Sequence, residues 1–326
     1  MKNAAHTGER FVIRGQTRRH LFRKQWTLQV FVLLGIVFLA IFSYAPMFGL
    51  LMAFKDYKIT DGIIGIFTSK FVGFKYFSEF FHEYNFKTIV TNTVGISVLK
   101  LIFSFPAPII LAIMLNEVRS VPFKRTVQTI SYLPNFISWV IVSGFALIFL
   151  SADNNGIINV LLVKTGIASK PLPFLTSPSY FWGLAVLTSI WKETGWWAII
   201  FLAAISGIDP QMYEAAEVDG ASRLKRIWYI TLPSIKSTVT VVLILALGNL
   251  LGGGLGGSSF EQSFLLGNPA NISRSEIIQT YVFRVGLSEG RYAYATAVGL
   301  IQSFISLILV LTSNYASKKV SGNSLF

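Results

Sequence analysis

The sequence predicts an all-α integral membrane protein with six transmembrane helices, on the basis of its composition and its long uncharged stretches. Of the 326 residues, 53% are hydrophobic and only 13% are charged, whereas a soluble domain carries about 25% charged residues. Several stretches of about 20 residues or more are almost free of charge, and an α-helix of that length crosses the roughly 30 Å hydrocarbon core of a bilayer. Lipid is therefore expected to surround most of this chain.

Six stretches are long and apolar enough to be these spans. In order, they are Thr27–Ala53, Thr88–Leu115, Thr126–Leu150, Tyr180–Ile208, Ser237–Leu255 and Tyr292–Tyr315. The apolar run of the first is about twice that of a secretory signal peptide, so we expect a retained anchor. No long linker interrupts the chain, which indicates one membrane domain. Its predicted parts are a basic N-terminal tail (1–26), the first span with an extracytoplasmic loop (27–85), a core with the other five spans (86–315) and a C-terminal tail (316–326).

The basic residues set the predicted orientation, because cytoplasmic loops carry an excess of Lys and Arg. With six spans, all of the main basic clusters fall on one side of the membrane. These clusters are residues 10–24, Arg119 with Lys124 and Arg125, Arg223 with Lys225, Arg226 and Lys236, and Lys318 with Lys319. Both termini and the loop over 209–234 are therefore expected to be cytoplasmic. The net charge of +13 then reflects basic loops rather than a nucleic-acid partner.

Residue types needed for catalysis or metal binding are missing or scattered. The chain has no Cys, which excludes disulfides, thiol catalysis and Cys-ligated metal. Its three His residues lie outside the predicted spans, and no HExxH or Ser-His-acid grouping is present. No Gly-Lys dipeptide occurs, which excludes a phosphate-binding loop of the usual pattern. We expect no catalytic residue, no metal and no cofactor in this chain.

A glycine-rich run, residues 252–257, follows the fifth apolar stretch. Glycine destabilises a helix interior, so the run is expected to fray this helix at its outer end. Irregular backbone at membrane depth must be covered by protein or must line a wet cavity. Simple fraying and a position beside a translocation path are both compatible with the run.

The polar loop between the fourth and fifth spans has the pattern of a structured segment. Asp209-Pro210 provides an N-cap followed by Pro at the first helical position. Residues 211–218 then favour a helix, Gly220 bends it, a second helical piece covers 221–230, and Pro233 ends that piece. An amphipathic hairpin at the lipid headgroups would explain the same pattern.

This loop also resembles the EAA motif of the membrane subunits of binding-protein-dependent ABC importers. Glu214-Ala215-Ala216, three residues, Gly220, nine residues, Ile230, one residue and Leu232-Pro233 match every position of that motif. The resemblance implies the type I ABC importer permease fold, in which the loop is a cytoplasmic coupling helix seated in a cleft of a separate nucleotide-binding subunit. It implies an ATPase-coupling role for residues in this loop, namely Glu214, Ala215, Ala216, Asp219, Gly220, Ile230, Leu232 and Pro233.

Other segments extend the resemblance from about residue 86 to residue 314. They are Asn92-Thr93, the group Gly156, Ile158 and Asn159, residues 190–216, FEQSFLLGNP, and TYVFRVGLSEGRYAYATAVGL. The last two, together with residues 44–49, are similar to the LplB-like permeases of carbohydrate uptake, which are associated with complex or acidic oligosaccharides. The implied substrate is therefore a sugar, with an oligosaccharide expected.

The resemblance also implies partners and a location. A second, non-identical permease would complete a heterodimer, two cytoplasmic subunits would bind ATP and magnesium, and an extracytoplasmic solute-binding protein would deliver the sugar. The location would be the plasma membrane of a prokaryote. Since ATP hydrolysis would belong to other subunits, this chain would be no enzyme.

A self-contained secondary transporter is the alternative. It would need internal repeats, of which we find none, and buried titratable groups for ion coupling. Lys100, Lys192 and Glu193 do lie within predicted spans, where charge is unfavourable and points to a cavity or a partner. Lys100 is expected either to pair with an acid on a neighbouring helix or to line a pore.

The candidates for the substrate pathway are polar and aromatic residues of the third and fourth spans: Asn135, Trp139, Trp191, Lys192, Glu193 and Trp196. Aromatic faces can stack on sugar rings. Asn135 and Trp139 are four residues apart in the third span and are therefore expected on one helix face. Pro134 is expected to kink that helix and to free a carbonyl. An interfacial aromatic belt and a hydrogen bond between helices would explain the same residues without a substrate. Adjacent helical residues lie about 100° apart around the helix axis, so Lys192 and Glu193 must point in different directions.

Overall fold

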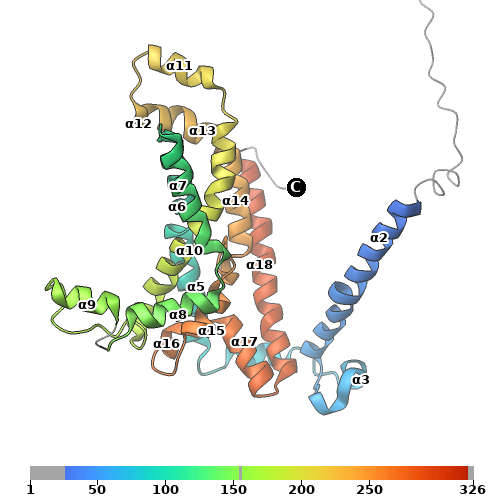
Figure 1. Cartoon of the computed structure of the whole chain (residues 1–326). Coiled ribbons are helices and arrows are strands. Elements are labelled where there is room, and N and C mark those ends of the chain that lie inside the picture. Colours follow the sequence, from blue (N-terminus) through green and yellow to red (C-terminus); the bar gives the residue numbers. More distant parts are fainter. Residues whose placement is uncertain (1–25, 154–155, 322–326) are drawn as a thin grey trace, which may run out of the picture. The chain divides into compact units, whose positions relative to one another are not determined.

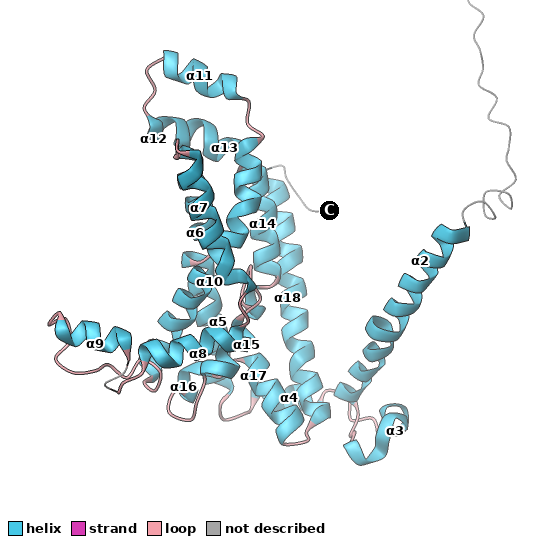
Figure 2. Ribbon diagram, in the orientation of Figure 1, coloured by secondary structure: helices cyan, strands magenta, loops and turns pink. Residues whose placement is uncertain are grey.

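Helices make up nearly all of the computed structural model, which describes residues 26–153 and 156–321. These two ranges contain no strand, and one isolated antiparallel bridge joins Lys55 to Phe71. The chain divides into two compact units, 1–51 and 52–326, which are described separately (Figure 1 and Figure 2). The predicted all-α class is confirmed, whereas the basic N-terminal tail lies almost entirely outside the described residues.

The first unit contains one long apolar segment. It consists of α2 (Trp26–Leu39), a π-helical turn (Ala40–Tyr44) and the start of a 3-10 helix (Ala45–Phe54) that continues into the second unit. The whole segment is 29 residues long and apolar enough to cross a membrane, and α2 has no buried residue. Exposing apolar surface to water is unfavourable by about 25 cal/mol per Å², so lipid suits this segment.

The segment over 55–85 carries a 3-10 turn (Ile59–Asp61), α3 (Gly62–Thr68) and α4 (Lys75–Phe81). Helix α4 packs on α18 (Tyr292–Ser321), and its Tyr76 belongs to the same buried cluster as Tyr294. Tyr76 donates a hydrogen bond to Asp56 Oδ1 (2.8 Å). Burial, as the main cause, and this hydrogen bond, as the second, raise the pKa of Tyr76 to about 12, so its hydroxyl stays a hydrogen-bond donor well into the alkaline range.

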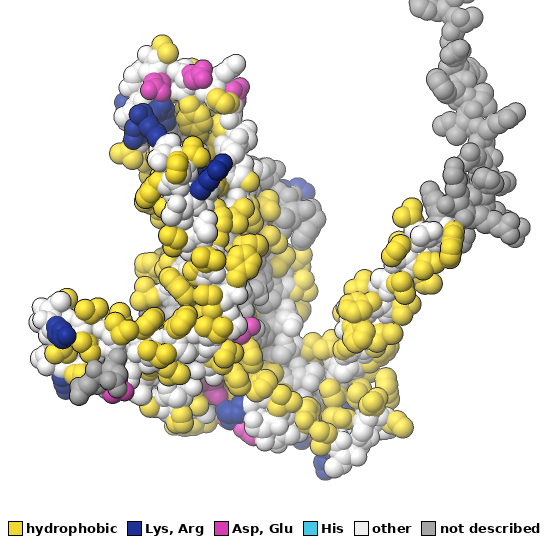
Figure 3. Space-filling model, in the orientation of Figure 1, with side chains coloured by type: hydrophobic (Ala, Val, Ile, Leu, Met, Phe, Trp, Pro, Cys, Tyr) yellow, Lys and Arg dark blue, Asp and Glu magenta, His cyan; other side chains and the backbone are white. Residues whose placement is uncertain are grey.

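Five helices form the body of the second unit: α5 (Phe86–Phe103), α6 (Pro106–Glu117), α10 (Pro178–Ser206), α14 (Lys236–Gly248) and α18. Helix α10 packs along α6 and α5, and α14 packs along α18 (Figure 2). Figure 3 shows hydrophobic side chains over the sides of this body. Such apolar sides are expected where lipid is the solvent.

The third predicted span is broken rather than continuous. It consists of α7 (Val121–Tyr132), a 3-10 turn (Leu133–Phe136) and α8 (Trp139–Leu150), with a bend of 102° between the two halves. Pro134 lies in the turn, and Ser138 caps α8 by accepting a hydrogen bond from the Ile141 backbone N–H (3.4 Å). The span bends near the predicted proline, but the break falls at residues 137–138, after the turn that holds Pro134, and it is large enough to turn the chain.

A bend of 62° separates Arg223–Ser234 from α14 and lies just before the fifth predicted span, Ser237–Leu255. Its regular helix ends at Gly248 rather than at the expected Leu255. By length and composition, three described segments can cross a membrane, or up to five if each bent pair is one span. Helix α10, which corresponds to the fourth predicted span, is 29 residues long but is not among these membrane-crossing segments. It carries the charged residues Lys192 and Glu193.

Short helices cover one end of the second unit, around α8 (Figure 1). They are α9 (Ile157–Lys164), α15 (Ser259–Leu266), α16 (Ile272–Ser275) and α17 (Ile278–Phe283), which continues into a π-helical turn (Arg284–Ser288). The opposite end carries α11 (Pro210–Val218), α12 (Arg223–Arg226) and α13 (Leu232–Ser234). The polar loop and the short helices around α8 thus lie at opposite ends of the helical body.

Candidate functional site

The first arm of the polar loop is α11, and its ends follow the predicted signals. Asp209 caps the helix by accepting a hydrogen bond from the Gln211 backbone N–H (2.9 Å), and Pro210 occupies the first turn. The backbone N–H of Asp219 donates to an α11 carbonyl (3.0 Å). Gly220 then adopts a φ of +72°, a left-handed conformation that costs residues with a Cβ free energy. The predicted cap and bend are both confirmed.

The return arm differs from the single helix expected over 221–230. Ser222 caps α12 by accepting a hydrogen bond from the Lys225 backbone N–H (3.4 Å). A π-helical turn, η5 (Ile227–Thr231), and then α13 follow. Pro233 therefore does not end this arm: it lies in the first turn of α13, where a missing N–H is tolerated, and the break comes at Ile235.

Helix α11 has no buried residue. Glu214 and Ala215 are exposed, Ala216 is half-buried, and Val218 is 89% exposed. Figure 3 shows acidic and basic side chains over α11 and α12. A helix this short is marginal on its own in water, so the exposed surface of α11 is suited to contact another protein.

Lys192 binds the break between α7 and α8. Its ammonium donates hydrogen bonds to the carbonyls of Asn135 (2.8 Å) and Pro134 (3.3 Å) and lies 5.6 Å from the centroid of the Trp139 ring. Carbonyls at a helix end lack helical partners. Buried Lys192 provides a partner for the Asn135 carbonyl and a second one for the Pro134 carbonyl, which also accepts a hydrogen bond from the Ile137 backbone N–H (3.2 Å). The prediction that Asn135 and Trp139 share one helix face is wrong, because the break lies between them. Both nevertheless contact Lys192.

The two predicted tryptophans of α10 differ in their surroundings. Trp196 packs edge-on against Phe136 with ring centroids 5.5 Å apart, which places it beside the α7–α8 break, and it is 42% exposed. Trp191 is 49% exposed. Within the described residues, no ring contact or hydrogen bond joins the Trp191 side chain to this group.

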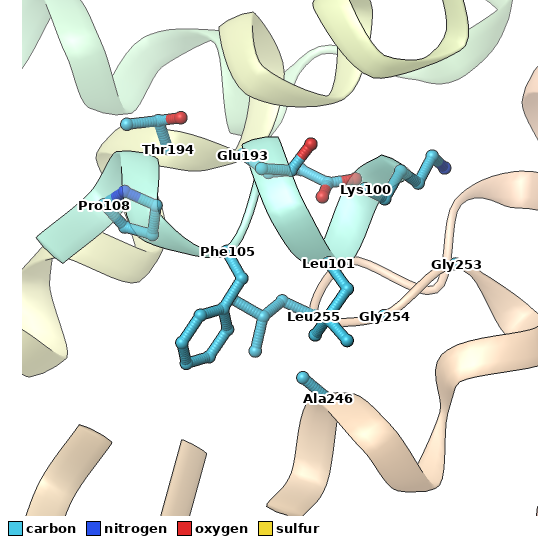
Figure 4. Close-up of a pocket in the computed structure, with 11 residues that line it drawn as sticks. Lys100, Leu101, Phe105, Pro108, Glu193, Thr194, Ala246, Gly253, Gly254 and Leu255 are labelled. Atoms are coloured by element: carbon cyan, nitrogen blue, oxygen red, sulfur yellow. The ribbon is translucent and has the colours of Figure 1, made fainter. Parts of the chain in front are cut away.

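Glu193 points away from Lys192, toward α5 and the glycine-rich run. Figure 4 shows its carboxylate at a pocket between α5, α6, α10 and this run. The approach is close: a Cβ on Gly256 would lie 2.0 Å from the Glu193 carboxylate. The hydroxyls of Ser104 and Thr194 also line this pocket and have no hydrogen-bond partner within the described chain. The pocket has a volume of about 20 Å³, so it offers a carboxylate and two hydroxyls to a guest the size of a water molecule.

Lys100 is only 2% exposed and has more partners than the single acid considered from the sequence. Its ammonium donates hydrogen bonds to Gln262 Oε1 (2.5 Å), Ser259 Oγ (3.0 Å) and Ser258 Oγ (3.3 Å), and it also interacts with the Glu193 charge. Sequence reasoning missed these three polar partners. The signal that could have found them is the Ser-Ser pair directly after the glycine-rich run, with a Gln three residues later.

The first half of the glycine-rich run is covered by protein, whereas Gly256 is exposed. Gly252, Gly253 and Gly254 are buried, and the φ angles of Gly253 and Gly254 are +113° and +72°. The run also contributes Gly253, Gly254 and Leu255 to the wall of the pocket. The early end of the fifth helix is therefore a packed and specific structure rather than simple fraying.

Two other motifs that carry the family resemblance, Asn92-Thr93 and Asn159, form hydrogen bonds to the backbone of neighbouring loops. The side-chain amide of Asn92 donates to the carbonyls of Ser273 and Glu276, and the Thr93 hydroxyl accepts from the Ile278 backbone N–H (2.9 Å). Asn159 similarly donates to two loop carbonyls and accepts one loop N–H. These residues hold the short helices around α8 in place.

A helical body with apolar sides, charges buried within it and an exposed polar helix at one end together define a membrane transport subunit. The chain belongs to the family of binding-protein-dependent transport system inner membrane components, which it matches over residues 104–322. It is thus a permease subunit of an ABC importer, as its resemblance to the EAA motif implied. This membership favours the importer over the self-contained secondary transporter.

Relatives match along nearly the whole chain. Protein LplB of Bacillus subtilis is 43% identical, covering 94% of this chain and 92% of that protein. The polygalacturonan/rhamnogalacturonan transport system permease protein YteP of the same organism is 42% identical, covering 97% and 96%. In a crystal structure of a bacterial alginate ABC transporter in complex with an alginate pentasaccharide-bound periplasmic protein, one chain is 38% identical with a TM-score of 0.84, covering 94% of this chain and 99% of that one. The type I importer permease fold is thereby confirmed.

Proposed function

We propose that this permease imports an oligosaccharide, with a complex or acidic sugar as the substrate class, across the plasma membrane of a prokaryote. Support comes from what the relatives are named for: polygalacturonan and rhamnogalacturonan in one case, and the acidic polysaccharide alginate in another. A more distant relative, 29% identical, is named for arabinooligosaccharides. A sugar chain rather than a single sugar is common to these names.

The chain forms half of the pathway and receives its energy from other subunits. A second, non-identical permease completes the pathway, two cytoplasmic subunits bind ATP and magnesium, and an extracytoplasmic solute-binding protein delivers the sugar. ATP binding favours the outward-facing state because the ATPase subunits bind it more tightly in that state. In support, the sequence carries no phosphate-binding loop of its own.

Helix α11 is the coupling helix of this assembly, on the cytoplasmic side together with both termini. One observation carries this assignment: α11 is well capped, yet none of its residues is buried. Glu214, Ala215 and Ala216 meet the ATPase subunit, and small Ala side chains allow its backbone to approach closely. Asp219 and Gly220 set the bend after the helix. The motif residues of the return arm, Ile230, Leu232 and Pro233, connect the bend to α14.

The sugar pathway runs along α10 and the break between α7 and α8. Trp139, Trp196 and Asn135 lie around that break, and Trp191 offers a further ring face on α10. Glu193 lines the pocket shown in Figure 4. Lys192 contributes by holding the break in shape through the two carbonyls that it binds.

Replacement of Gly220 tests the coupling assignment. Nothing lies within 4 Å of a Cβ built on this glycine, so a substitution acts through the backbone alone. β-Branched Val is strained at φ +72°, whereas Asn tolerates this region. We expect Gly220→Val to lower sugar uptake by about fivefold or more in reconstituted vesicles, with normal insertion, and Gly220→Asn to stay close to wild type. Normal uptake by the Val variant would rule out a coupling role for this bend.

A further inference from the structure

Two side chains on one face of α11 hold the return arm. Tyr213 and Glu217 are four residues apart and therefore neighbours on the helix surface. The Tyr213 hydroxyl hydrogen-bonds the Thr231 hydroxyl (2.9 Å), and Glu217 Oε2 pairs with Arg226 Nη1 (2.8 Å). The pairing is antiparallel, because the earlier residue of α11 meets the later residue of the arm. With no residue of α11 buried, these polar contacts take the place of apolar packing.

The π-helical turn η5 gives the arm the register that this pairing needs. Arg226 and Thr231 are five residues apart, and in an α-helix that separation turns the second side chain about 140° from the first. A π-helix forms i→i+5 hydrogen bonds, and here the Leu232 N–H donates to the Ile227 carbonyl. The wider turn brings residues five apart closer to a common face, so both partners reach α11.

The two contacts differ in their surroundings. Thr231 is 1% exposed, and the chain that follows it enters the body of the protein at once, since Leu232 and Ile235 pack with buried residues of α10 and α14. The side chains of Glu217 and Arg226 are 70% and 18% exposed. Exposed ion pairs contribute little, and a shielded hydrogen bond constrains geometry more strongly.

We propose that the Tyr213–Thr231 hydrogen bond, assisted by the Glu217–Arg226 ion pair, is the mechanical link that passes a displacement of α11 to α14. The inference rests on the proposed coupling function of α11 and assigns positioning roles to four residues of the loop. Without the link, α11 can tilt on its two connecting segments while α14 stays in place. With it, α11 and the arm move as one body.

Removal of single hydroxyl groups tests the link in the complete reconstituted transporter. Tyr213→Phe and Thr231→Val each delete one partner and keep the size of the side chain. The quantity to measure is the amount of sugar taken up per ATP hydrolysed, with an oligosaccharide bound by the cognate binding protein as the probe. We expect each variant to lower this ratio by about fivefold or more. The double variant should fall no further, because both changes break one bond.

Two matched controls use residues of the same arm. Tyr229→Phe also removes a phenolic hydroxyl, but Tyr229 is 79% exposed, so the ratio should stay at the wild-type value. Thr231→Ser keeps the hydroxyl and should also keep the ratio. For the ion pair, Glu217→Arg and Arg226→Glu should each lower the ratio, and the combined charge exchange should raise it again.

Several results would overturn the link. They are a wild-type ratio in both Tyr213→Phe and Thr231→Val, additive losses in the double variant, or a loss in Thr231→Ser as large as in Thr231→Val. If Thr231→Val does not assemble, the ratio of sugar taken up to ATP hydrolysed in Tyr213→Phe and Thr231→Ser still tests the link. A defect in Gly220→Val together with a normal ratio in Tyr213→Phe would keep the coupling helix and remove only this link. Normal transport by all of these variants would contradict both the coupling role of α11 and the proposed link.

Discussion

Lys192 and Glu193 are adjacent in the sequence but face different neighbours around α10. Lys192 satisfies backbone carbonyls at the α7–α8 break, and Glu193 faces Lys100 and the pocket beside the glycine-rich run. Each charge has a partner, which is the condition for placing ionisable groups within a membrane segment. The two residues are therefore expected to have separable roles, one in maintaining the fold and the other in transport.

Neutral substitutions separate these roles. Lys192→Met keeps an unbranched side chain of similar size and removes the donor, so the Asn135 carbonyl loses its partner, whereas the Pro134 carbonyl keeps the Ile137 backbone N–H. Leaving a buried acceptor unsatisfied is unfavourable by about 1–3 kcal/mol, and we expect a lower thermal stability of the purified complex and less assembled protein. Glu193→Gln retains the shape and one acceptor oxygen but removes the charge, so we expect normal assembly with altered uptake.

Thermal unfolding of both variants in detergent, together with uptake in vesicles, provides the measurement. Lys192→Met with wild-type stability would show that the carbonyls at the break do not depend on this ammonium. Glu193→Gln with wild-type uptake would remove Glu193 from the pathway and leave it as a contact between helices.

At the scale of elements, the contact of α10 with the end of α7 depends on one glycine. A Cβ on Gly195 would lie 1.9 Å from the backbone oxygen of Ser131, which is far inside van der Waals contact. Because the atom met is backbone, neither helix can relieve the clash by a side-chain rotation. The same close approach brings Lys192, three residues earlier, to the carbonyls that it binds.

Gly195→Ala should therefore destabilise the protein, since inserting a methyl group into a closely packed interface typically costs about 1–3 kcal/mol. Gly183→Ala in the same helix is the matched control, because nothing lies within 4 Å of a Cβ there and alanine is the better helix former. We expect a lower melting temperature for the first variant and an equal or higher one for the second. Equal melting temperatures for both would show that α7 and α10 do not approach as closely as described.

At the scale of the whole molecule, we expect the two ends of the second unit to lie on opposite sides of the membrane. The loop with α11 and α12 carries the basic residues that predict a cytoplasmic location. The 55–85 segment, in which Tyr84 is 96% exposed, is expected on the extracytoplasmic side. The chain has no native Cys, so single cysteines report accessibility without a background.

Labelling of intact cells with an impermeant thiol reagent checks this orientation. Tyr84→Cys should react from outside, and Ser222→Cys should react only after the membrane is permeabilised. Cells that lack the ATPase subunits are the sample of choice, because a docked subunit would cover Ser222 as well. Reaction of Ser222→Cys from outside would reverse the orientation and remove the coupling role, whatever the result of the other experiments.

The sequence by itself determined the solvent, the helical class and the structured polar loop that matches the EAA motif. Composition and uncharged stretches depend on local chemistry, and so do the Asp209 cap, the Gly220 bend and the spacing of the EAA motif. These features involve residues close together in the chain, so their signals can be read without knowing what lies across the interface.

Only the tertiary structure decided what the buried polar groups do. Lys100 meets Ser258, Ser259 and Gln262, which lie about 160 residues away. The Ser-Ser pair and the Gln are visible in the sequence, but only the packing of the helices shows that they meet Lys100. The 102° bend between α7 and α8 likewise exceeds what a proline alone implies, because Lys192 of a distant helix satisfies the carbonyls that the bend exposes. Within a membrane, polar groups must find partners inside the protein, and the packing of distant helices determines which partners are within reach.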